Sequence, residues 1–348
     1  MPAKVYVDRV LVHWGEELLW DESHRSVRKK PAQSSPITLP KFGAGGRSNA
    51  AGSQAANAVK AAKVREHLAA LVRKAPQVMV KITGGGADMR RIGSHIDYIA
   101  RGGKYKKKDQ EELEIETDDG QVIHGKEARA QLKDMFAYSG TPIPAEVQDL
   151  TSDTTLQRRQ RREALNMILS MPHGIQRETV KAAARATVRE LFGNNHLFAM
   201  VHHEDTDHQH THVVVKMVGH DGKRLNPKKA DLENWRLAFA RQLNARGIDA
   251  VATRRRVRLQ RKKGESQAVR QIKDRGEEPL REGTSKTQDV AQMRAQANEK
   301  QATQAYKEMA QALASSDLSE DRKLAQGLQG YLKQHGVELR LRRQPGIR

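Results

Sequence analysis

The sequence predicts an α+β domain between residues 76 and 253, with a central antiparallel sheet flanked by helices. Three observations carry this prediction. Segments of strand type and of helix type alternate along the region, which is typical of mixed domains. Two of the strands follow each other across a short acidic turn at residues 204–207, and so short a link favours antiparallel pairing. Glycines, aspartates and a proline mark the ends of most segments.

The first part of this region predicts a strand, a helix and a hairpin. Residues 78–83 are mostly apolar and end at three consecutive glycines, as expected of a strand. Residues 87–101 predict a helix that stops at a pair of glycines. Residues 111–124 predict a hairpin that turns on the sequence Asp-Asp-Gly at residues 118–120.

The second part predicts three strands and two helices. Residues 166–171 form a short apolar strand that ends before a proline, and residues 178–192 have apolar residues at helical spacing. The two strands around the acidic turn cover residues 196–203 and 210–218. A last amphipathic helix, which stops near Gly247, is marked by Leu232, Trp235, Phe239 and Leu243.

The segments on either side of this domain differ from it in composition. Residues 1–75 form an N-terminal extension with a Ser-, Gly- and Ala-rich linker, followed by an Ala-rich helix over residues 56–75. Residues 254–348 form a basic C-terminal extension that is mostly helical, with a Gln- and Ala-rich helix at 287–315. We predict no second enzymatic core in the C-terminal extension.

The composition is strongly basic, with 62 Lys and Arg residues against 42 acidic ones and a pI near 10.1. Such a balance favours a polyanionic partner, above all nucleic acid, over a merely solvated basic surface. The absence of cysteine excludes disulfides, cysteine zinc fingers and thiol catalysis, and fits a reducing cytoplasm. No apolar stretch approaches the roughly 20 residues of a membrane span, so we expect no membrane insertion. Aromatic residues are only 4%, which argues against extensive base-stacking platforms.

Four of the fourteen histidines lie within the ten residues from His203 to His212. Alternation along a strand would place His208, His210 and His212 on one face, with neighbours about 7 Å apart. One neighbouring pair can share a divalent metal, and His203 is the candidate for the third imidazole. A solvated polar face is the competing interpretation of this pattern.

A three-histidine metal site can be structural or catalytic, and the pattern alone leaves both open. Zn²⁺ suits imidazole ligands, whereas Mg²⁺ and Mn²⁺ need further oxygen ligands, which a substrate phosphate can supply. In so basic a protein, an open metal position indicates phosphodiester chemistry.

Tyr98 is the candidate nucleophile. In the helix of residues 87–101 it lies about 140° from the apolar stripe, so core packing does not explain it. An ordinary surface tyrosine is the alternative, and Tyr105, in a Lys-rich loop, is the second candidate nucleophile.

Four motifs in this order resemble the P-type (MOBP) conjugative relaxases and mobilization nucleases, the group that includes the T-DNA border nuclease. The segment around Tyr98 is similar to their tyrosine motif, and residues 203–215 to their histidine motif. Gln209 departs from the family, which usually has proline there, and the 75 residues before the domain are unusual. The four matching segments are residues 96–103, 170–174, 203–215 and 221–227.

The resemblance implies an HUH-type relaxase that nicks one DNA strand at the nic site of a transfer origin. Tyr98 would attack the phosphodiester and form a covalent 5′-phosphotyrosine adduct. His203, His210 and His212 would hold the metal, Mg²⁺ or Mn²⁺ with Zn²⁺ as an alternative. Asp205 would orient a ligand imidazole or help to deprotonate the tyrosine, and His208 would act as base or substrate contact, although it competes with His203 for the metal site.

The implied partners are single-stranded and origin DNA, an accessory origin-binding protein and a type IV secretion coupling protein. The expected location is the bacterial cytoplasm, with transfer of the protein alongside DNA from a plasmid or integrative element. Lys104, residues 106–108 and residues 254–263 would then contact phosphates. Two alternatives remain: an HUH-type replication initiator or transposase, which usually has its tyrosine after the histidines, and a non-catalytic DNA-binding protein with structural zinc.

Overall fold

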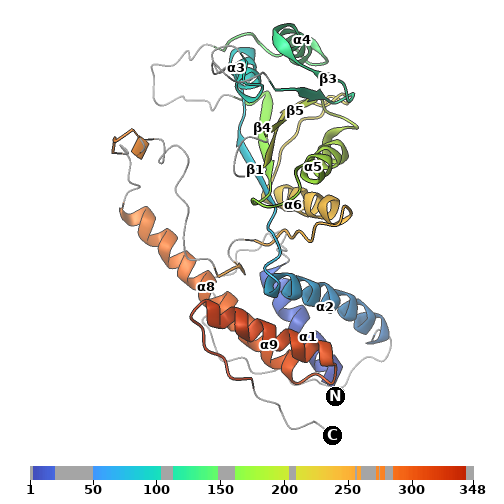
Figure 1. Cartoon of the computed structure of the whole chain (residues 1–348), viewed down its shortest axis with the longest axis vertical. Coiled ribbons are helices and arrows are strands. Elements are labelled where there is room, and N and C mark those ends of the chain that lie inside the picture. Colours follow the sequence, from blue (N-terminus) through green and yellow to red (C-terminus); the bar gives the residue numbers. More distant parts are fainter. Residues whose placement is uncertain are drawn as a thin grey trace. The chain divides into compact units, whose positions relative to one another are not determined.

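The computed structural model (Figure 1) describes residues 3–19, 50–102, 113–147, 161–203, 209–254, 257–259, 272–273, 275–278 and 285–341. The chain divides into two compact units. One comprises residues 75–252, and the other combines residues 1–74 with residues 253–348. Among the described residues, no helix has the length and apolar character that crossing a bilayer requires.

The unit of residues 75–252 is built on a six-stranded sheet with the order β1-β4-β6-β5-β2-β3, in which all neighbouring strands are antiparallel. The predicted α+β class with a central antiparallel sheet is therefore confirmed. The strand pair expected around the acidic turn, β5 and β6, occupies the middle of the sheet. The strands are β1 (Met79–Gly84), β2 (Ile115–Thr117), β3 (Val122–Ile123), β4 (Ala164–Ser170), β5 (Phe198–His203) and β6 (His210–Lys216).

Two pairs of helices cover the two faces of this sheet. Helices α3 (Met89–Ile99) and α4 (Gly125–Tyr138) pack on one face, and α5 (Arg177–Phe192) and α6 (Lys229–Asn244) on the other. Strand β6 shows the alternation: Val214 joins the α3–α4 core, while Val213 and Val215 join the α5–α6 core. His210 and His212 share the parity of Val214, so they lie on the α3–α4 face.

Periodicity in the sequence predicts no element at residues 125–138, where the structure has α4. The reason is a charged residue on its inner face, because Arg129 is only 6% exposed and interrupts the apolar pattern formed by Leu132 and Phe136. A second buried cation holds the end of this helix. The Lys216 ammonium donates to the carbonyl oxygens of Phe136 (2.8 Å) and Ser139 (2.6 Å) and so occupies acceptors that the helix leaves unpaired.

The other unit is helical and contains α1 (Ala3–Leu18), α2 (Ala50–Val72), α8 (Ser285–Ala314) and α9 (Ser319–Gln334). All four contribute to one apolar core. Within it the Arg65 guanidinium donates to Asp8 and Asp321, each at 2.7 Å. From the sequence the two terminal segments were expected as separate extensions; in the structure their described helices pack together. Of the basic residues 254–263, only 254 and 257–259 are among those described.

Candidate metal centre and nucleophile

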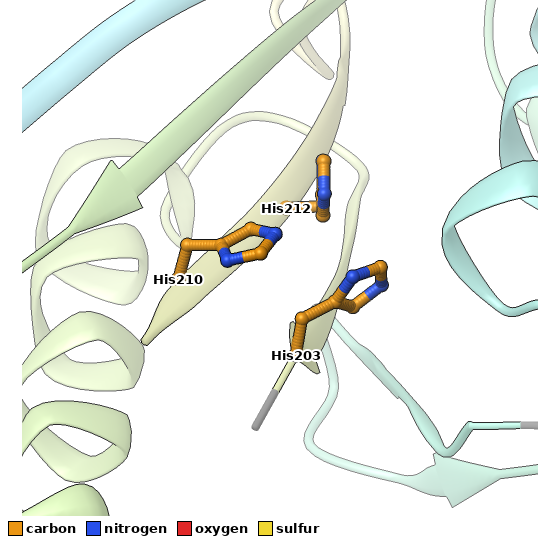
Figure 2. Close-up of side chains that lie close together, drawn as sticks. All are labelled: His203, His210 and His212. Atoms are coloured by element: carbon orange, nitrogen blue, oxygen red, sulfur yellow. The ribbon is translucent and has the colours of Figure 1, made fainter. Parts of the chain in front are cut away.

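Three histidines meet at the end of the central strand pair. The register of β5 against β6 places His203 directly opposite His210, and His212 is two residues further along β6 on the same face. The ring centroids are 4.5–4.9 Å apart, and one ring nitrogen of each lies within 4.8 Å of the others. Figure 2 shows the three rings gathered over the strand ends. These are the three histidines that the sequence singled out as a metal set.

The cluster is buried and electrostatically suited to a cation. His203 and His212 are 7% and 5% exposed. Burial, reinforced by the neighbouring histidines and Arg101, lowers the pKa of His212 to about 3. The ring is thus neutral near pH 7, which is the form that binds metals. Its buried Nδ1 has no hydrogen-bond partner among the described residues, so the site has an unsatisfied ligand atom. The three residues therefore fit a divalent metal.

A backbone carbonyl fixes the orientation of His203. Its Nε2 lies 2.7 Å from the carbonyl oxygen of Ile99, the last residue of α3. A carbonyl only accepts, so we assign the proton to Nε2, and the lone pair of the neutral ring then lies on Nδ1. Hydrogen bonds of this kind commonly orient metal-binding histidines.

Tyr98 faces the histidines from α3. The helix buries Ile92, Ile96 and Ile99 and leaves Tyr98 44% exposed, in agreement with its predicted position away from the apolar stripe. The Tyr98 ring centroid lies 6.1 Å from that of His212, at an interplanar angle of 86°. An accessible phenol thus stands beside the candidate metal centre.

His95 is a fourth imidazole at this site that the sequence reasoning missed. Its ring stacks on Tyr98 with centroids 6.0 Å apart and meets His212 edge-on at 6.3 Å. Burial lowers the pKa of His95 to about 4. Its spacing in the sequence could have indicated this position, because a residue three positions before Tyr98 lies beside it on a helix.

An ion-pair cluster ties α3 to α4 next to the tyrosine. Asp97 accepts from Arg129 Nη1 at 2.7 Å and from Lys133 Nζ at 2.7 and 2.8 Å. The Arg129 guanidinium also packs so closely on Gly102 that a Cβ there would lie 2.2 Å from its central carbon. This contact gives a packing reason for glycine at the end of the tyrosine motif.

The opposite face of the strand pair carries a second polar cluster. His202 Nδ1 lies 2.8 Å from the hydroxyl of Thr211, its cross-strand partner. Glu116, 4% exposed, binds Arg185 at 2.6 Å and Arg189 at 2.9 Å. These contacts join β5 to β6 and β2 to α5 on the face opposite the three histidines.

Asp205 and His208 lie outside the described residues, as do Tyr105, Lys104 and residues 106–108. Their predicted roles therefore have no structural description.

The antiparallel sheet, with histidines from its two central strands facing a helix-borne tyrosine, is the arrangement of an HUH-type nuclease domain. Residues 116–248 match the model of the relaxase family described as MobA/VirD2-like, nuclease domain. The domain of residues 75–252 is accordingly a relaxase domain of the HUH type. The matched segment contains the three histidines, whereas Tyr98 precedes it. A search of curated proteins finds no match to the chain.

The match of this domain to the relaxase family has general consequences for function. A relaxase nuclease domain implies DNA binding and DNA cleavage. The histidine cluster can bind a divalent metal, as relaxases do.

Proposed function

We propose that this protein is a site- and strand-specific relaxase that nicks one strand at the nic site of a transfer origin through a covalent tyrosine adduct. The observation that carries the proposal is the exposed Tyr98 ring, 6.1 Å from the ring of His212. A phenol so close to a three-histidine cluster suits nucleophilic attack on a phosphodiester. The basic charge of the chain, formally +20, supports a nucleic acid as substrate.

His203, His210 and His212 are the proposed ligands of one divalent metal, Mg²⁺ or Mn²⁺, with Zn²⁺ as the alternative. Three imidazole ligands leave coordination positions for phosphate oxygens, which the harder cations prefer. When bound, the metal supplies a positive charge that offsets the negative charge developing on the phosphoryl oxygens. The hydrogen bond from His203 to the Ile99 carbonyl keeps its ring oriented toward the other two.

Tyr98 carries the covalent step. Its hydroxyl loses a proton, and the phenolate oxygen attacks the phosphorus of the scissile phosphodiester. A bond forms between that oxygen and phosphorus, and the bond from phosphorus to the 3′ oxygen breaks. The released 3′ oxygen takes up a proton. One phosphodiester replaces another, so the step is reversible and uses no cofactor energy. Asp205 and His208 are the proposed groups that accept the proton or orient the ligands.

The proposed biological setting is conjugative mobilization of a plasmid or integrative element from the bacterial cytoplasm. The adduct would accompany the transferred strand into the recipient through a type IV secretion channel, with an accessory origin-binding protein and a coupling protein as partners. These partners follow from the resemblance in the tyrosine and histidine motifs.

The decisive experiment is a covalent-adduct assay with the full chain. The protein is incubated with Mg²⁺ or Mn²⁺ and a pool of single-stranded oligonucleotides from the intergenic DNA of its own element, then run on a denaturing gel. We expect a shifted protein–DNA band that disappears in Tyr98→Phe and that identifies the nic site. DNA cleaved without a shifted band would instead indicate attack by metal-bound water.

The same samples test the non-catalytic alternative. A protein with structural zinc would bind DNA without cleavage, Tyr98→Phe would have no effect, and a chelator would unfold the domain. A relaxase is expected to stay folded after chelation and to lose cleavage, which circular dichroism and the gel measure side by side.

A further inference from the structure

One side of α5 carries a row of cations at intervals of four residues. Residues four apart on a helix are offset by only about 40°, so the row forms one stripe along the helix. The two acids of α5 are Glu178, in the first turn, and Glu190, which binds Arg241 and Gln242 of α6 on another flank. The stripe consists of Arg177, Lys181, Arg185 and Arg189.

The two halves of the stripe have different surroundings. Arg185 and Arg189 both bind the buried carboxylate of Glu116 on β2. One carboxylate against two guanidinium groups leaves net positive charge, but these two residues also hold α5 on the sheet. Their removal would leave Glu116 as a buried charge without its partners, so they have a structural role.

The other half of the stripe lies beside the strand ends that carry two of the candidate metal ligands. Arg177 and Lys181 line the same small surface pocket as His203 and His210 at the ends of β5 and β6. Arg177 is exposed and Lys181 half-buried. The first two cations of the stripe therefore lie at the ends of the strands that carry these histidines, on the α5 side of the sheet.

We propose that Arg177 and Lys181 bind the phosphates of the single strand next to the scissile phosphodiester, so that the strand runs along α5 away from the histidines. The proposal rests on the proposed function. One row of cations on one helix matches the single phosphate backbone of an unpaired strand, whereas a duplex has two phosphate backbones. Since the chain is poor in aromatic residues, charge is the main means of holding an unpaired strand.

The test is the salt dependence of single-strand binding by the full chain. Affinity for a fluorescent oligothymidine is measured by anisotropy across a KCl series for the wild type and for Arg177→Ala/Lys181→Ala. Each phosphate contact to a single strand contributes about 0.7 to the slope of log affinity against log salt. We expect the double variant to lower that slope by about 1.4 and to bind roughly tenfold more weakly at low salt.

Two controls separate position from total charge. Lys229→Ala/Arg246→Ala removes two exposed cations of the same domain that do not line this pocket, and we expect the wild-type slope. Arg177→Lys/Lys181→Arg keeps the charges and is expected to keep the slope. Thermal melting must show that every variant is folded.

An unchanged slope in the folded alanine double variant, or an equal loss in the Lys229 and Arg246 control, would overturn the proposal. The adduct assay separates this result from failure of the proposed function. If the wild type forms the adduct and the alanine double variant binds DNA normally, the proposed nicking activity stands. Only the proposal that the strand runs along α5 is then overturned.

Discussion

The Nε2 of His203 donates a hydrogen bond to the Ile99 carbonyl oxygen at 2.7 Å, which joins the end of β5 to the last turn of α3. Ile99 follows Tyr98 directly in the chain. The same bond therefore selects the tautomer of a candidate metal ligand and holds the helix that carries the candidate nucleophile. It also occupies a carbonyl that the helix end leaves without a partner. The orientation of a candidate metal ligand and the position of the candidate nucleophile therefore depend on the same hydrogen bond.

The first prediction concerns metal binding. We expect the wild type to bind one divalent ion per chain by isothermal titration with Mn²⁺ or Zn²⁺, and His212→Ala to lose that binding. The reason is that His212 lies in the buried cluster and has an unsatisfied ring nitrogen. His220→Ala, which changes an exposed histidine outside the cluster, is the matched control. Equal affinity in the two variants would contradict the assignment.

A second prediction concerns His95 as a positioning residue for Tyr98. Because its ring stacks on the phenol at 6.0 Å, we expect His95→Ala to slow adduct formation at saturating DNA about tenfold. Metal affinity should change little, since His95 is not one of the three clustered ligands. His95→Phe keeps a ring at the same place and should recover most of the rate. A parallel loss of metal affinity would instead make His95 part of the metal centre.

The sequence predicted most of the sheet domain because its elements follow simple apolar periods. The strands are short, mostly apolar runs, and α5 and α6 have apolar residues at helical spacing. Helix α4 was missed because its inner face includes Arg129, whose burial depends on Asp97 of another helix. The spacing of apolar residues within α4 alone gives no information about that partner.

The remaining gaps have the same origin. His95 belongs to the site because its ring contacts that of His212, which lies on a strand more than a hundred residues later in the chain. The helical unit was not predicted as one body because its core joins α1 and α2 to α8 and α9, from opposite ends of the chain. The clustering of His203 with His210 and His212 could be predicted, since a short turn between two strands brings their ends together.

The third prediction is that the metal-free domain loses stability as the pH falls below about 6.5. Burial lowers the pKa of His95 to about 4 and that of His202 and His212 to about 3. The unfolded chain takes up these protons at a higher pH than the folded chain. Stability is therefore complete above the unfolded pKa and decreases as the pH falls toward the folded values.

Each of these histidines contributes at most about 1.4 kcal/mol per pH unit to that decrease. Urea unfolding at pH 7.5, 6.0 and 5.0, with a chelator present, measures the effect. His220→Ala should retain the wild-type slope, since that histidine is exposed. Constant stability over this range would show that the three rings do not remain neutral in the folded protein.

The last prediction concerns the ion-pair cluster beside the tyrosine. Arg129→Met should destabilise the domain by about 2 kcal/mol, less than the 3–5 kcal/mol typical of a broken buried pair, because Lys133 still neutralises Asp97. Gly102→Ala should act through the same contact, since its Cβ would displace the Arg129 guanidinium. Adduct formation should slow in both variants at temperatures where both are folded, because the end of α3, which carries Tyr98, loses a supporting contact.

Gly330→Ala is a suitable control, as a Cβ there meets no atom within 4 Å. If Gly102→Ala matches that control in both melting temperature and rate, Arg129 does not hold the tyrosine helix.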